Sequence, residues 1–205
     1  MAIRQRRYLC VVGLLLLMTA PLSVGSPQGV GSEGDQGCLC HTPMDATEVR
    51  LVNLPDTYEA NTTYPIQLEL RSPISVNDEG AQGGFRMTVS NGTVLFDNAS
   101  QVHLLDGAWT HTETGIYQRT WSFNWTSPLE NDSRAEFIVS GNAVNGNQAQ
   151  TGDGWHQVQF VTVGAQYTGN AAPSSLIDGL GLADGIVLLI GILALIGLLW
   201  SAMKP

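Results

Sequence analysis

The chain has 205 residues, a formal net charge of −9 at pH 7 and 43% hydrophobic residues. Residues 27–177 contain 16 Asp and Glu against five Arg and no Lys. A surface so rich in carboxylates repels nucleic acid and offers no basic groove, which excludes DNA and RNA as partners. The roughly 150 residues between the two ends suffice for one domain with a hydrophobic core.

Residues 1–25 have the composition of a secretory signal peptide. Three arginines in "MAIRQRR" precede an apolar stretch, and small residues follow it. Ser23 and Gly25 fit the positions before a cleavage site, so the mature chain is expected to begin at Ser26. An uncleaved anchor is the alternative, but the apolar core is shorter than the roughly 20 residues that span a bilayer. Residues 26–36 are then expected to be a flexible lead-in.

The stretch "GCLCHTPM" (residues 37–44, the Cys/His segment) contains the two cysteines that remain once Cys10 is removed with the leader. Exported proteins usually use cysteines in disulfides that join distant parts of the chain. Cys38 and Cys40 are one residue apart and cannot join distant strands. A bridge between them would close a small, strained ring that is easily reduced.

Three chemical interpretations of this segment stay open, beside the absence of any chemical role. Cys38, Cys40, His41 and Met44 together form a soft donor set that suits Cu(I) or Zn. The two thiols and the adjacent imidazole also resemble a covalent haem attachment motif, although the usual C-x-x-C-H spacing of that motif is one residue longer. The third interpretation is a labile redox disulfide between the two cysteines.

Five segments between residues 64 and 163 predict β-strands. Apolar and polar residues alternate with period two in 64–70, 84–90 and 116–125, and the apolar face of the last is formed by Tyr117, Trp121, Phe123 and Trp125. The segments 134–140 and 155–163 extend the pattern, and turn-rich pieces separate the strands. About seven short strands predict an all-β, immunoglobulin-like antiparallel β-sandwich.

The predicted domain also carries several Asn-x-Ser/Thr sequons, which are glycosylation candidates in an exported protein. Most of them fall near expected turns, where a glycan would not disturb the core. They are Asn61, Asn91, Asn98, Asn124 and Asn131.

The C-terminal part of the chain predicts a linker and a membrane anchor. Residues 165–181 are small and polar, and the 19 residues from Gly185 to Met203 carry no charge. A helix of that length covers roughly 28 Å, about one hydrocarbon core. We therefore predict a transmembrane helix over 182–203 with a cytoplasmic tail at 204–205. Lys204 places that tail inside, so the expected location is a single-pass protein of the cell membrane with an extracytoplasmic domain and the lipid bilayer as a partner.

Several motifs occur in an order that resembles a known family. They are "GCLCHTP", "LPDTYEANTTYPIQLEL", "GGFRMTVSNGTVLF", "WTHTETG", "TWSFNWTSP" and "FIVSGNAVNGN". Over roughly residues 37–164 the chain resembles the Reeler-like domains of microbial surface proteins, also called choice-of-anchor V domains, which are related to the reelin N-terminal domain. The resemblance implies an immunoglobulin-like sandwich displayed outside the cell, an interchangeable C-terminal anchor and no known catalysis.

The same resemblance implies a set of matching site residues, namely Cys38, Cys40, His41 and His111. If a metal binds, His111 is the expected fourth ligand. The competing interpretation is a structural, hydrogen-bonded histidine. His103 is a weaker candidate, and His156 is expected to pack beside its apolar strand neighbours.

No enzyme motif is present: the chain has no G-x-S-x-G elbow, no H-E-x-x-H and no phosphate-binding glycine loop. Asp106 and Asp153 each precede a glycine, which is first a turn signature. Two functions remain. One is a binding or adhesion domain at the cell envelope, with the Cys/His segment as a metal or structural clip. The alternative is an exported redox or electron-transfer domain that carries haem or copper there.

Overall fold

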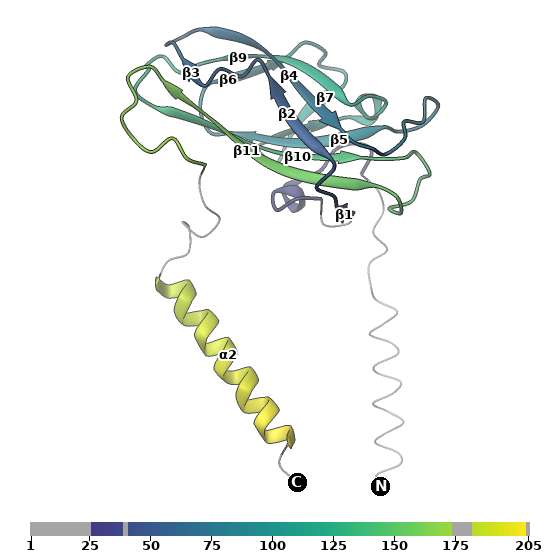
Figure 1. The fold of residues 1–205 in the computed structure, drawn as a ribbon, viewed down its shortest axis with the longest axis vertical. Coiled ribbons are helices and arrows are strands. Elements are labelled where there is room, and N and C mark those ends of the chain that lie inside the picture. The colour runs from purple at the N-terminus through teal and green to yellow at the C-terminus, as the bar shows by residue number, and fades with distance from the viewer. Residues whose placement is uncertain (1–25, 39–40, 174–181, 204–205) are drawn as a thin grey trace. The chain divides into compact units, whose positions relative to one another are not determined.

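The computed structural model describes residues 26–38, 41–173 and 182–203, and the predicted signal peptide lies outside these residues. The chain forms two compact units, residues 1–168 and 169–205. The described strands all belong to the first unit, and the second contains a helix (Figure 1).

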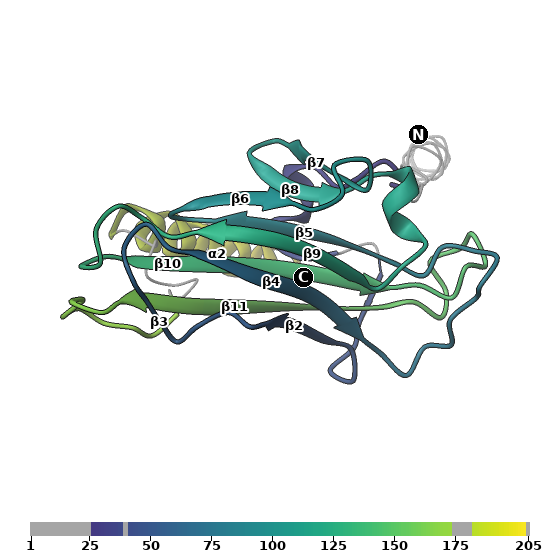
Figure 2. The same ribbon diagram turned by 90° about the horizontal axis from the view of Figure 1, so that it is seen from above.

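The first unit is built from two β-sheets. In spatial order, the seven-stranded sheet contains β1 (Thr42–Pro43), β11 (Gly154–Gly164), β10 (Arg134–Ala143), β5 (Gly83–Val89), β8 (Ala108–His111) and β7 (Val102–Leu105), with β3 (Thr57–Tyr58) also paired with β11. The four-stranded sheet contains β2 (Glu48–Val52), β4 (Thr63–Arg71), β9 (Thr120–Thr126) and β6 (Thr93–Phe96). The two sheets share one hydrophobic core and lie one over the other when seen from above (Figure 2), so the predicted all-β sandwich is confirmed. The pairing is not purely antiparallel, because β1 and β3 run parallel to β11.

The core lies between the sheets and is rich in aromatic side chains. Trp121, Phe123 and Trp125 alternate along β9 and are each at most 2% exposed. Trp125 packs edge-on against Tyr58 and Phe137 of the opposite sheet, with ring centroids 5.4 and 5.5 Å apart. Such aromatic pairs add about 0.5–1.5 kcal/mol to the stabilisation from apolar burial. The period-two pattern of this segment therefore encodes the contact between the two sheets.

The predicted strand at 116–125 begins later than its pattern indicated. Residues Glu113–Ile116 form the 3₁₀ helix η2, and β9 starts at Thr120. Tyr117, which we placed on the buried face, is 54% exposed. The prediction was wrong at this residue because the backbone carbonyl of Gly115 accepts the indole N–H of Trp121, which keeps the turn of η2 against the start of the strand.

Strands β7 and β8 form a hairpin that the strand pattern did not predict. Asp106 and Gly107 occupy its two-residue turn with φ of 48° and 77°, and Leu105 pairs with Ala108. Positive φ at both central residues is the geometry of the turns that best match the twist of a hairpin. The interpretation of Asp106 as a turn residue is thus confirmed. The Asp-Gly dipeptide at 106–107 is a hairpin signal that could have predicted β7 and β8.

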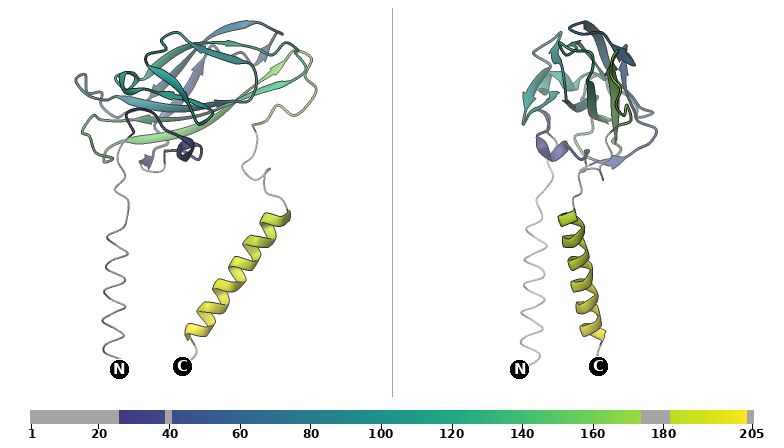
Figure 3. Two further views of the ribbon diagram at one scale, coloured as in Figure 1. Left: turned by 180° about the vertical axis from the view of Figure 1, so that it is seen from behind. Right: turned by 90° about the vertical axis from the view of Figure 1, so that its left-hand side faces the viewer.

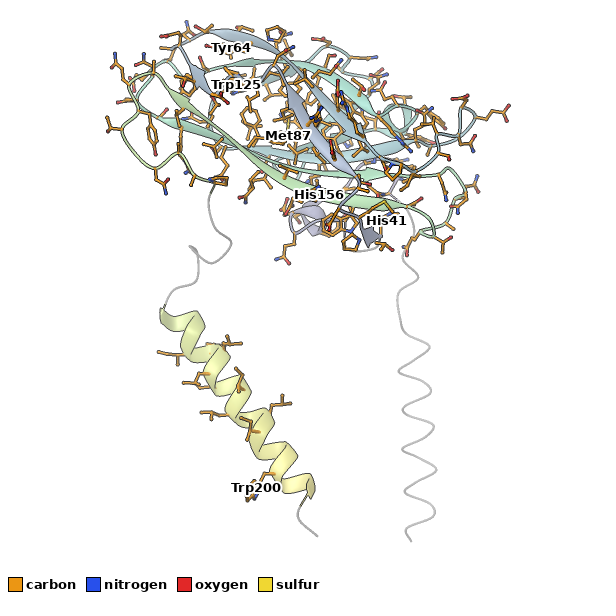
Figure 4. The ribbon with its side chains drawn as sticks, in the orientation of Figure 1. His41, Tyr64, Met87, Trp125, His156 and Trp200 are labelled. Carbon is orange, nitrogen blue, oxygen red and sulfur yellow. The ribbon has the colours of Figure 1, made fainter. Side chains whose placement is uncertain are left out.

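The second unit contains α2 (Leu182–Met203), whose described large apolar side chains, Trp200 among them, are exposed (Figure 4). We predicted a transmembrane helix over 182–203 and a single-pass location in the cell membrane. A span needs about 20 consecutive apolar residues. In the described part of the chain no helix is long and apolar enough to cross a membrane, so the prediction of a single-pass membrane location is wrong.

The buried hydroxyl of Tyr58 provides a test of how β3 is held. Its Oη lies 2.9 Å from the carbonyl oxygen and 2.8 Å from the hydroxyl of Ser133, in the loop before β10. Replacement of Tyr58 by Phe removes these hydrogen bonds inside an otherwise unchanged core, and we expect it to lower the free energy of unfolding by about 1 kcal/mol.

Urea denaturation followed by tryptophan fluorescence measures this loss. Tyr117→Phe is the matched control, because its ring is exposed and the change should stay within about 0.5 kcal/mol. Equal midpoints for Tyr58→Phe and the control would contradict the role given to the Tyr58 hydroxyl.

Candidate functional site

The described residues 26–38 (the N-terminal segment) lie along the outer face of the seven-stranded sheet, shown in purple in Figure 3. The N–H of Val30 donates to Oγ1 of Thr110 at 3.0 Å, and the side-chain amide of Gln157 donates to the carbonyl of Asp35 at 3.0 Å. These contacts reach β8 on one side and β11 on the other. The stretch 26–36, predicted as a flexible lead-in, is therefore held against the sheet.

Arg86 of β5 is the main anchor of this segment. Its side chain is 3% exposed, and its Nε donates to Oδ1 of Asp35 at 2.6 Å. Its Nη1 donates to the carbonyls of Val30 (2.9 Å) and Leu105 (3.1 Å). A guanidinium presents several donors in a fixed plane, so one buried arginine can bind both the N-terminal segment and the β7–β8 hairpin.

The Cys/His segment follows at the edge of the same sheet. Gly37 has a φ of 103° and lies directly against the ring of Trp155, where no side chain would fit. The indole N–H of Trp155 donates to the carbonyl of His41 at 3.0 Å, and the N–H of Met44 donates to the carbonyl of Trp155 at 2.9 Å. Together with the parallel pairing of β1 and β11, these bonds fix the backbone of His41 beside β1 (Figure 4).

Cys38 and His41 are brought together by a backbone hydrogen bond. The N–H of His41 donates to the carbonyl of Cys38 at 2.9 Å. A bond of this kind between residues i and i+3 normally keeps their Cα atoms within about 7 Å. Cys38 is half-buried, whereas Cys40 lies outside the described residues.

His41 also meets a carboxylate that the sequence did not connect with it. Its Nδ1 lies 3.2 Å from Oδ2 of Asp153, without the alignment of a regular hydrogen bond. The side chain of Asp153 is 3% exposed and that of His41 is 17% exposed. Asp153 directly precedes β11 and His41 directly precedes β1, so the parallel pairing of these two strands brings the side chains together.

Met44 does not join His41. A Cβ built on Gly154 would lie 2.9 Å from Sδ of Met44, so the thioether packs on the side of β11 that a Gly154 side chain would occupy. Successive residues of a strand face opposite sides, and Trp155 faces the other side with Gly37. The structure therefore separates Met44 from the face that carries His41.

His111 is also distant from the Cys/His segment. It ends β8, and β5, β10 and β11 lie between β8 and β1. Four strand spacings of about 4.8 Å place the two histidines roughly 19 Å apart. Within residues 26–38, 41–173 and 182–203, no three His, Cys, Asp or Glu side chains gather closely enough to hold a metal ion.

His111 occupies a buried position under the start of the N-terminal segment. It is 5% exposed, and its ring lies over Gly84, where an added Cβ would come within 2.5 Å of it. The N–H of Phe85 donates to Nδ1 at 3.0 Å, the carbonyl oxygen of Phe85 lies 3.1 Å from the same atom, and Nε2 lies 3.1 Å from the carbonyl oxygen of Ser26. Burial lowers the pKa of His111 from 6.5, with a smaller lowering from nearby His103, while the backbone groups of Phe85 and Ser26 act in the opposite direction.

The remaining histidines lie elsewhere. His103 on β7 is half-buried, and its Nε2 is directed at the backbone of Gly29. His156 pairs with Gly141 and shares its face of β11 with Val158 and Phe160, as expected for a packed histidine.

The sequons differ in how accessible their side chains are. Asn61 and Asn98 are exposed, and Oδ1 of Asn98 accepts from both the N–H and the hydroxyl of Ser100. Three others are half-buried, and two of these use their amides within the protein: Asn124 bonds Asp97, and Asn91 bonds Ser133. The third is Asn131. Glycosylation itself stays a prediction for all five.

No protein-family model and no curated protein sequence matches the chain. Among solved structures, it is similar to the human F-spondin reeler domain, with 13% identity and a TM-score of 0.40 over 60% of this chain and 91% of that one. It is also similar to a conjugative transposon lipoprotein from Bacteroides eggerthii, with 16% identity and a TM-score of 0.37 over 58% and 98% of the two chains. A conjugate transposon protein from Bacteroides vulgatus gives 13% identity and a TM-score of 0.37 over 64% and 94%. Reeler domains are thus among the solved structures that this chain resembles, as its motifs predicted.

The buried position of His111 predicts a pH dependence of stability. The unfolded chain takes up a proton on this residue near its ordinary pKa, whereas the folded chain resists protonation because its pKa is lowered. The unfolded state therefore binds more protons in this range, and stability falls as the pH falls from above 6.5 towards the folded pKa. His111→Gln removes this titration, so its free energy of unfolding should decline less than that of the parent between about pH 7.5 and 5.5. Urea denaturation at several pH values measures the two slopes, and parallel slopes would contradict the assignment.

Proposed function

We propose that the chain is an envelope-associated, immunoglobulin-like β-sandwich that binds a metal ion through its Cys/His segment. The observation that carries the proposal is the placement of His41, whose Nδ1 lies 3.2 Å from the buried carboxylate of Asp153 while its backbone N–H is bound to the carbonyl of Cys38. Metal-binding histidines usually donate one ring N–H to a carboxylate or carbonyl while the other nitrogen binds the metal. The signal-peptide composition of residues 1–25 supports export.

The donor chemistry of the segment fits a soft or borderline metal. The backbone hydrogen bond between His41 and Cys38 keeps a sulfur-bearing and an imidazole-bearing residue close together, and Cys40 lies between them in the sequence. Two thiolates and one imidazole suit Zn or Cu(I). Met44 and His111 lie away from this face, so the proposed set consists of Cys38, Cys40 and His41, with a further position left to water or an external group.

Metal titration of the reduced, mature chain tests the proposal. Under anaerobic conditions, Zn(II) and Cu(I) are added and metal content is measured after gel filtration. One equivalent should remain on the parent, and both His41→Gln and the Cys38→Ser/Cys40→Ser pair should lose it. His103→Gln is the matched control, since it changes a histidine outside the segment and should bind like the parent.

Two results would overturn the assignment. Equal metal content in the parent and the cysteine pair variant would show that the segment is not the site. A Soret band that survives acid–acetone extraction of the native protein would instead establish covalently attached haem, the alternative group that the same residues could hold.

A further inference from the structure

We infer that Asp153 is a positioning residue that holds His41 with the proton on Nδ1 and so presents Nε2 to the metal. The identity of the ligand, a metal ion, rests on the proposed function. The contact between Asp153 and His41 is a property of the metal-free protein. Asp153 was assigned from the sequence to a turn, and its meeting with His41 appears only in the folded chain.

Asp153 is itself held in place by the loop before β11. Its Oδ1 accepts the N–H of Asn145 at 3.1 Å. The side-chain amides of Asn145 and Asn147 both donate to the carbonyl of Thr151, at 3.1 and 2.9 Å. The loop therefore fixes one carboxylate oxygen and leaves Oδ2 directed at His41.

The backbone of His41 is equally fixed, on the other side of the contact. Its N–H is bound to the carbonyl of Cys38 and its own carbonyl accepts the indole N–H of Trp155. Both hydrogen bonds are made by backbone groups of His41 and do not involve its side chain. The ring is thus delivered to Asp153 by the backbone, and the 3.2 Å approach of Nδ1 to Oδ2 follows from the fold.

The chemistry of the two atoms selects the tautomer. An ionised carboxylate only accepts hydrogen bonds, so an unprotonated Nδ1 beside it would set two lone pairs against each other in a buried place. A proton on Nδ1 removes this repulsion and leaves Nε2 as the lone-pair nitrogen of a neutral imidazole. That nitrogen is the one a metal ion would bind.

Two measurements test the inference, and the first needs no metal. In the metal-free parent, ¹⁵N NMR of histidine side chains at neutral pH should show His41 with its proton on Nδ1. Asp153→Ala should shift His41 towards the Nε2–H form. In the second measurement, Zn(II) affinity of Asp153→Ala should fall by about 10- to 100-fold relative to the parent.

Asp106→Ala is the matched control, because Asp106 also precedes a glycine but lies in the β7–β8 turn, where it accepts the N–H of Ser32. It should leave both the tautomer and the Zn(II) affinity unchanged. Asp153→Asn keeps the size and the oxygen that accepts from Asn145, and serves as the second variant if removal of the side chain prevents folding, as judged by circular dichroism. The amide should still weaken Zn(II) binding, since it lacks the charge that polarises the imidazole.

The outcomes separate the two ideas. A His41 proton on Nε2 in the parent, or a tautomer unchanged in the folded Asp153 variants, would overturn the positioning role whatever metal binds. Parent-like Zn(II) affinity in Asp153→Ala would do the same. If the tautomer behaves as expected but the parent binds no metal, the proposed function fails while the positioning of His41 stands.

Discussion

Strand β11 is the element on which the arrangement of the sandwich depends. It pairs antiparallel with the whole of β10, from Val163 opposite Arg134 to Gly154 opposite Ala143. Its first two residues pair with β1 and its last two with β3, both in parallel. The same strand therefore holds the Cys/His segment at one end and Tyr58 at the other. A buried backbone N–H or C=O group without a hydrogen-bond partner costs free energy. The short parallel pairs with β1 and β3 are therefore stable only while β11 keeps its register.

Arginine side chains supply a second constraint in a chain that is otherwise poor in basic residues. Arg119 joins the β4–β5 loop to the β10–β11 loop, since its guanidinium donates to the carbonyls of Gln82, Ile74 and Val144 at 2.9, 2.8 and 3.2 Å. Arg86 joins the N-terminal segment to the β7–β8 hairpin in the same way. Both use backbone carbonyls as their main acceptors. An arginine can thus organise irregular backbone that contributes little to the apolar core.

Much of the core could be predicted from the sequence because it depends on local alternation. Trp121, Phe123 and Trp125 were assigned to one buried face, and all three are buried. The start of that strand could not be predicted from alternation, because Tyr117 fits the pattern yet precedes β9 and follows the 3₁₀ turn. The strand order also had no local signal. Adjacent strands in the sheet, such as β5 and β10, are separated by several elements in the sequence.

The candidate site shows the same division between local and long-range information. Cys38 and His41 are neighbours in sequence and in space, so their grouping was predictable. His111 seemed a partner because of the resemblance, but the sheet places three strands between it and β1. Asp153 went unnoticed because its role arises from a two-residue parallel pairing, which is too short to leave a periodic pattern. The apolar C-terminal stretch predicted a helix correctly, whereas the membrane crossing drawn from it was wrong.

The burial of Arg86 has a practical consequence for where the domain can be cut. Two of its acceptors, the Val30 carbonyl and the Asp35 carboxylate, come from residues that precede the segment matched by the family motifs. A recombinant fragment started at Gly37 would retain every described strand but lose residues that cover Arg86, together with two of the oxygens that accept its hydrogen bonds. Truncated forms meant for expression or crystallisation therefore need to begin at Ser26, because the folding unit extends further towards the amino end than its strands do.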